Sequence, residues 1–136
     1  MNEKEVALFA LKERYPEYFR EGLDLVKWVN DNIILNQGDN YALFEYMNDN
    51  TVAGHYFFTD ADYGTSFILA ETFIQKLFRD YPEIKTIVGK TPKEHTAALA
   101  LTKRLGFSHI ADTEQDEAVF VLERPQGCDH NRKEDS

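Results

Sequence analysis

The chain of 136 residues has the usual length of one domain and is too short for two. Hydrophobic residues make up 43% of it and aromatic residues 13%, which is enough apolar surface for a single core. The formal net charge of −9 argues against a protein that holds nucleic acid through its phosphates. This charge suits a protein partner and a cationic substrate equally well, and a solubilising surface is the commoner reason for it.

Three features predict a cytoplasmic protein without membrane association. The single cysteine, Cys128, excludes a disulfide framework and suits a reducing compartment. The first residues, MNEKEVALF, are acidic where a signal peptide would be basic. No apolar run is long enough to span a membrane.

Apolar side chains recur at helical spacing in residues 3–13 and 17–31, and Tyr15-Pro16 is expected to separate these two helices. Short apolar runs then alternate with turn-forming residues, which predicts an antiparallel meander. Its strands are expected at 33–36, 41–47 and 52–59, with turns at 38–40 and 48–50. Helical spacing returns at 66–79, after the small residues Gly64, Thr65 and Ser66.

The last third of the domain contains a strong local signal for a helix. After a β-branched strand at 84–89, the residues Thr91, Pro92 and Glu94 match a capping box, so a helix is predicted over 92–105. Its buried face is expected to carry Ala98, Leu101 and Leu105, and Gly106 to end it in the left-handed conformation. Strands at 107–111 and 118–122 complete a domain of residues 1–124, followed by a disordered polar tail of residues 125–136.

These elements predict a single α/β domain with a mixed sheet and the order ααβββαβαββ. The order, together with the segment Val88 to Phe107, resembles the GCN5-related N-acetyltransferase (GNAT) fold. The match to the last helix of that family rests on five residues. They are Ala98, Leu101, Leu105, Gly106 and Phe107.

The resemblance implies a place for acetyl-CoA, whose pyrophosphate would lie at the start of the 66–79 helix. Gly64, Thr65, Ser66 and His95 are the cofactor-binding residues that it implies. Ala61 replaces the family's basic or amide residue, and Asp60 and Asp62 bring negative charge toward the phosphates. The sequence therefore predicts binding weaker than millimolar or none, with Tyr56, Phe58 or Tyr63 as side chains that could close the pantetheine path.

The positions expected to carry chemistry are also altered. Thr102 stands where the family has the tyrosine that protonates the departing thiolate, and His95 stands at the family's asparagine. A base on the third strand of the meander would have to be His55, or else Asp60; the alternative for His55 is a half-buried structural histidine. Cys128, Asp129 and His130 are too close together to form a metal site, so no metal is predicted.

Within the GNAT-like proteins, the segment from Gly89 to His95 and the Leu105-Gly106-Phe107 end look most like a group encoded by short-tailed phages. That resemblance implies a catalytically degenerate scaffold that contacts other virion proteins during head assembly, without a cofactor. The alternative is an active N-acetyltransferase that uses acetyl-CoA. The losses at Ala61 and Thr102 favour the first interpretation, and Gly64 and the intact order of elements keep the second open.

Overall fold

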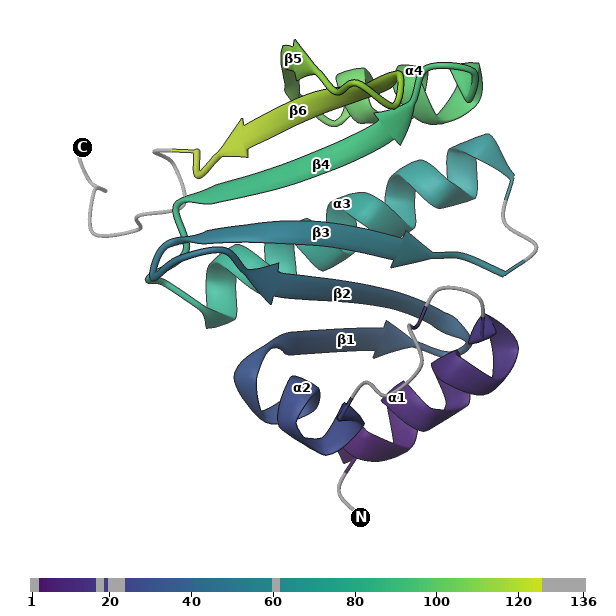
Figure 1. Ribbon diagram of the computed structural model, residues 1–136, viewed down its shortest axis with the longest axis vertical. Helices are drawn as coiled ribbons and strands as arrows, with labels where there is room; N and C mark the ends of the chain where they lie inside the picture. Colours follow the sequence, from purple (N-terminus) through teal and green to yellow (C-terminus); the bar gives the residue numbers. More distant parts are fainter. Residues whose placement is uncertain (1–2, 17–18, 20–23, 60–61, 126–136) are drawn as a thin grey trace.

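The computed structural model describes residues 3–16, 19, 24–59 and 62–125. A six-stranded mixed sheet with the strand order β1-β2-β3-β4-β6-β5 forms its centre, and the element order is ααβββαβαββ, as predicted (Figure 1). The strands are β1 (Ile33–Gln37), β2 (Asn40–Tyr46), β3 (Thr51–Phe57), β4 (Thr86–Pro92), β5 (Ser108–Asp112) and β6 (Glu117–Glu123). The helices are α1 (Glu3–Arg14), α2 (Leu25–Asp31), α3 (Tyr63–Asp80) and α4 (Thr96–Arg104).

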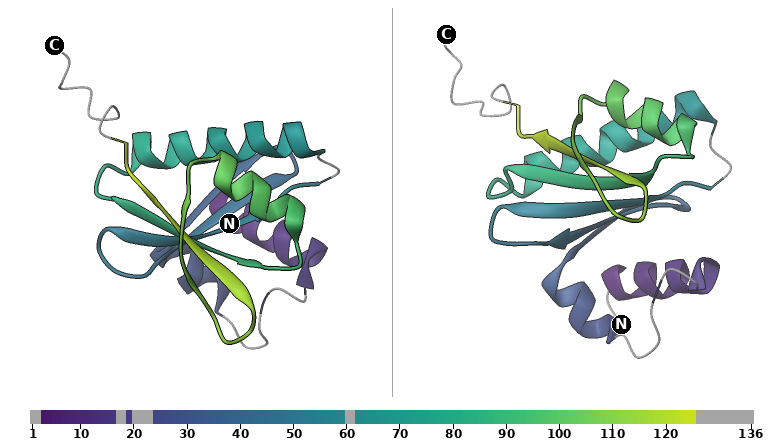
Figure 2. Two further views of the ribbon diagram at one scale, coloured as in Figure 1. Left: turned by 90° about the horizontal axis from the view of Figure 1, so that it is seen from above. Right: turned by 45° about the horizontal axis from the view of Figure 1, so that its top comes forward.

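Helices cover both faces of this sheet. Figure 2 shows α3 and α4 on one side of the strands and α1 and α2 on the other. Because neighbouring residues of a strand point to opposite faces, Ile33 and Phe44 join the core under α3, while Ile34 and Leu43 join the core under α1 and α2. Each core is closed by apolar side chains at helical spacing, such as Phe73 and Leu77 of α3.

Three helix starts differ from the predictions, and the first two are those of α2 and α3. The helix predicted at 17–31 is present as α2, which begins after Asp24 because this side chain accepts a hydrogen bond from the Lys27 N–H. Phe19 lies outside it, and Leu23 is not among the described residues. The helix predicted at 66–79 begins three residues earlier, at Tyr63, with Asp62 as its N-cap.

The helix predicted at 92–105 is wrong at its start. Thr91 and Pro92 are the last residues of β4, paired with Ala118 and Glu117 of β6, and α4 begins only at Thr96. Pairing along the whole of β6 outweighs the local capping pattern. A proline without an N–H is tolerated here because β4 has a neighbouring strand on one side only beyond Val88.

The end of α4 is as predicted. Gly106 has a φ of +102°, its N–H donates to the Lys103 carbonyl, and the Phe107 N–H donates to the Thr102 carbonyl. These two bonds are those of a Schellman motif. The strand predicted at 107–111 is β5, which forms an exposed edge of the sheet.

Residues 126–136 of the predicted tail are not among the described residues. No helix in the described part of the chain is both long and apolar enough to cross a membrane.

Candidate functional site

The centre of the sheet contains a cleft where two parallel strands separate. β3 and β4 pair only at Thr51–Ala53 with Thr86–Val88, although both strands continue for four more residues. Figure 1 shows the two strands side by side at one end and diverging toward the end where β3 leads to α3. Beyond Ala53, backbone N–H and C=O groups on this edge of β3 therefore have no neighbouring strand.

A cavity of about 500 Å³ lies in this cleft, between the two strands and α4. Its wall is mostly apolar, with a few polar groups from β3, β4 and α4. Among the residues that line it are Gly54, Tyr56, Phe58, Gly89, Ala98, Leu101 and Leu105.

This cavity changes the interpretation of α4. The side chains of Ala98, Leu101 and Leu105 were expected to pack on β4, but α4 has no fully buried residue among those described, and these three are half-buried in the cavity wall. Leu105 nevertheless packs against the core cluster that contains Ile84 and Ile87, so the expected contact is present at this end of α4 and borders the cavity. Tyr56 and Phe58 also line the cavity and leave it open, and Tyr63, which is 42% exposed, is not among the residues that line it.

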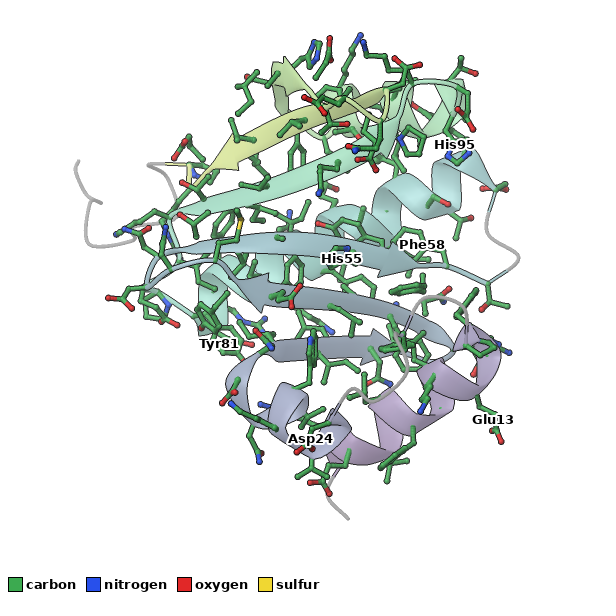
Figure 3. The ribbon with its side chains drawn as sticks, viewed as in Figure 1. Glu13, Asp24, His55, Phe58, Tyr81 and His95 are labelled. Carbon is green, nitrogen blue, oxygen red and sulfur yellow. The ribbon has the colours of Figure 1, made fainter. Side chains whose placement is uncertain are left out.

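His55 lies in the middle of β3 (Figure 3) and is among the residues that line the cavity. It pairs with Leu43 of β2, so its side chain is on the sheet face of α1 and α2, opposite Gly54 and Tyr56. Its Nε2 lies 3.9 Å from Glu45 Oε1 on β2, and 30% of its side chain is exposed. Burial lowers the pKa of His55 below its ordinary value, Glu45 acts against this shift, and Lys90 on β4 adds to it. The imidazole is therefore neutral at pH 7 and able to accept a proton.

The two predicted site residues of α4 also line the cavity. The hydroxyl of Thr102 donates to the Ala98 carbonyl at 2.8 Å, so its proton is held by the helix backbone. His95 is the N-cap residue of α4, but its side chain makes no capping hydrogen bond. Figure 3 places His95 and Phe58 toward the open end of the cleft, away from the closed end.

The predicted phosphate-binding residues form the first turn of α3. Gly64, Thr65 and Ser66 are helical, and Gly64 has no positive φ, so these residues belong to the helix that they were expected to precede. The Asp62 carboxylate accepts from the Thr65 N–H at 2.7 Å, and this bond holds the pKa of Asp62 below its usual range. An anion at this helix start would have to compete with Asp62. Asp60 and Ala61 are not among the described residues.

A basic side chain that the sequence analysis did not single out lies close to this turn. The guanidinium of Arg104, at the end of α4, is stacked over the ring of Phe67 at 4.1 Å and lies 5.8 Å from the ring of Tyr63. The sequence could have drawn attention to Arg104, because it directly precedes the Leu105-Gly106 pair that carries the family resemblance. It brings a positive charge from a distant part of the chain to the start of α3.

In residues 3–16, 19, 24–59 and 62–125, no group of three or more His, Cys, Asp or Glu side chains could hold a metal ion. Cys128, Asp129 and His130 are not among these residues.

Solved structures with a similar fold put this arrangement of strands and helices in context. The N-acetyltransferase PseH of Campylobacter jejuni matches with a TM-score of 0.61 and 15% identity, over 92% of this chain and 93% of that one. The fold is that of the GNAT acetyltransferases. PseH in complex with acetyl coenzyme A matches with a TM-score of 0.62 and 14% identity, over 92% of this chain and 94% of that one.

A GNAT-family acetyltransferase of Bacillus anthracis matches with a TM-score of 0.57 and 15% identity, over 73% of this chain and 70% of that one. No model of a known protein family and no curated protein matches the sequence. At these identities the structural matches establish the GNAT fold alone.

Proposed function

We propose that this protein is an N-acyltransferase that takes an acyl group, with acetyl as the simplest case, from acyl-CoA and transfers it to an amine. The observation that carries the proposal is the cleft itself, in which β3 and β4 part after three residue pairs and leave a cavity of about 500 Å³. A degenerate scaffold would have no need to keep this space open.

The cleft suits an extended ligand that contains amides, as the pantetheine arm of CoA does. The edge of β3 that has no neighbouring strand beyond Ala53 can bond such a ligand as it would bond a strand. Gly89 on β4 leaves room for it, because a Cβ added there would meet no atom within 4 Å. Arg104 beside the first turn of α3 supplies the positive charge that Ala61 does not.

When bound, the acyl thioester would supply the activated acyl group. His55 is the proton acceptor for the attacking amine in this proposal, because it lines the cavity and the lowered pKa favours its neutral form. Thr102 does not protonate the thiolate in this proposal, since its hydroxyl donates to Ala98. Water in the open cleft passes to the thiolate the proton that His55 takes from the amine, so CoA leaves as the thiol and His55 returns to its neutral form.

The charges around the site affect the affinity in opposite directions. Asp62 occupies the Thr65 N–H at the start of α3 and repels phosphates, whereas Arg104 attracts them. We therefore propose that acyl-CoA binds with a Kd of about 0.1 to 1 mM, tighter than the sequence alone predicts. The net charge of −9 is compatible with a cationic amine as the acceptor.

The other interpretation, that this is a phage protein that contacts other virion proteins during head assembly, stays a prediction. None of the described contacts favours it over the transferase, and the following experiment decides between the two.

The test is calorimetric titration of the protein with acetyl-CoA and with CoA, alongside Gly89→Trp. The indole is expected to fill the cavity and weaken binding at least about tenfold. Ile68→Trp is the matched control, because Ile68 on α3 is 62% exposed and does not line the cavity. If the unmodified protein binds neither ligand at millimolar concentration, or if Gly89→Trp binds as well as Ile68→Trp, the cleft is not the acyl-CoA site.

A further inference from the structure

The hydroxyl of Tyr56 is a buried polar group with no hydrogen-bond partner among the described residues. The ring belongs to the apolar core under α3, where it meets Phe44 edge-on at a centroid distance of 5.8 Å and Phe58 at 6.0 Å. Buried hydroxyls in folded proteins are nearly always paired, because an unpaired one has lost its water without compensation. An unpaired hydroxyl beside a cavity points to a partner that arrives with a ligand.

The Tyr56 hydroxyl lies where the pairing of β3 with β4 ends. It lies against Gly54, where an added Cβ would be 3.0 Å from the Tyr56 oxygen and 3.2 Å from the Phe44 ring. Gly54 is also the first residue of β3 beyond Ala53, the last residue that pairs with β4. The hydroxyl is therefore at the closed end of the cleft, and both Gly54 and Tyr56 line the cavity.

We propose that the Tyr56 hydroxyl donates a hydrogen bond to the carbonyl oxygen of the acyl group when an acyl thioester occupies the cleft. This inference rests on the proposed function. A ligand whose phosphates lie at the start of α3 enters the cleft at its open end and extends along β3 toward Gly54. The acyl end is the part that reaches the closed end, and its first polar atom is the carbonyl oxygen.

The chemistry of the two groups agrees with this assignment. A carbonyl oxygen only accepts hydrogen bonds, and the phenol can donate one. Burial raises the pKa of Tyr56, so the hydroxyl keeps its proton over the working pH range. Gly54 places no side chain between the hydroxyl and a ligand that lies along β3, which gives a physical reason for a glycine at this position.

The test is Tyr56→Phe, measured by titration with acetyl-CoA and with CoA, which has no acyl carbonyl. The variant is expected to bind acetyl-CoA about three- to tenfold more weakly, while its Kd for CoA stays unchanged. The melting temperature of the free variant is expected to rise, because an unpaired buried hydroxyl has been removed. A merely structural tyrosine would not change the ratio of the two affinities.

Tyr46→Phe is the matched control, because the Tyr46 hydroxyl on β2 already donates to Glu83 at 2.8 Å and lies away from the cavity. It should lower the melting temperature slightly and leave both affinities as they are. The inference is overturned if Tyr56→Phe keeps the wild-type ratio of affinities, or if the variant melts at a lower temperature than the wild type. Failure of the unmodified protein to bind either ligand would instead refute the proposed function, and the inference with it.

Discussion

The two edges of β3 differ in a way that explains the site. Toward β2, the strand is paired along six residues, from Val52 to Phe57. Toward β4, it is paired along three, from Thr51 to Ala53. The same backbone therefore forms a continuous sheet on one side and a cleft on the other.

This contrast locates the cavity at the point where one strand pairing ends. β2 and β3 are joined by a short hairpin and are antiparallel, whereas β3 and β4 are parallel and are connected through α3. At the closed end, Thr51–Ala53 of β3 pair with Thr86–Val88 of β4. Beyond this pairing the cavity leaves room for a ligand.

Breaking the closed end should have the largest effect on stability. Arg124, just after β6, donates to the carbonyls of Phe78, Tyr81 and Ile84 at 2.8 to 3.0 Å and lies over the Phe78 ring. It thereby ties the end of α3 to the chain entering β4. Arg124→Met leaves three carbonyls without this donor and should cost about 2 to 4 kcal/mol in the free energy of unfolding, measured by urea denaturation.

Arg79→Met is the control for this variant. Arg79 is an exposed side chain of α3 that pairs only with the neighbouring Asp80 among the contacts described, so its loss should change the unfolding midpoint little. Equal midpoints for the two variants would show that Arg124 does not hold the closed end.

A smaller loss is expected at the end of α4. Gly106 has a φ of +102°, so Gly106→Ala should cost about 1 kcal/mol because a side chain is strained in that conformation. Gly89→Ala is the matched control, since Gly89 has neither a positive φ nor an atom within 4 Å of an added Cβ. Thermal unfolding of both proteins measures the difference, and a loss in Gly89→Ala alone would contradict this account.

The elements of this fold could be predicted from the sequence because each has its own apolar period. The signals that failed were local ones that tertiary pairing outweighed. Thr91 and Pro92 have the residue types of a helix start, yet β6 offers them a strand partner. Gly64 was expected to precede its helix, but Asp62 caps this helix two residues before Gly64. Gly64 is therefore part of the first helical turn.

The site was only partly predictable for the same reason. His55, His95 and Thr102 were found from their positions in the family pattern, and all three line the cavity. The opening of the cleft could not be predicted, because alternation of apolar residues identifies a strand and not where its neighbour leaves it. Tyr56 was considered only as an obstruction, since no sequence pattern reports that a hydroxyl lacks a partner.

The smallest effect expected is a shift in the pH dependence of acyl transfer. Burial and Lys90 lower the pKa of His55, whereas Glu45 raises it. If His55 accepts the proton of the amine, activity should fall only as the pH drops below the ordinary histidine value of 6.5. Lys90→Met should move this acidic limb to higher pH, and Glu45→Gln should move it to lower pH.

Stability should depend on pH in the same window, which gives a readout that does not require a substrate. Because the folded-state pKa of His55 is below the unfolded value, its contribution is complete above pH 6.5 and is lost as the pH falls toward the folded pKa. His55→Gln should remove this part of the pH dependence of the unfolding midpoint. If the limbs of kcat/KM in Lys90→Met and Glu45→Gln coincide with that of the wild type while the stability profile responds to His55→Gln, His55 is a structural residue of the cleft and another group accepts the proton.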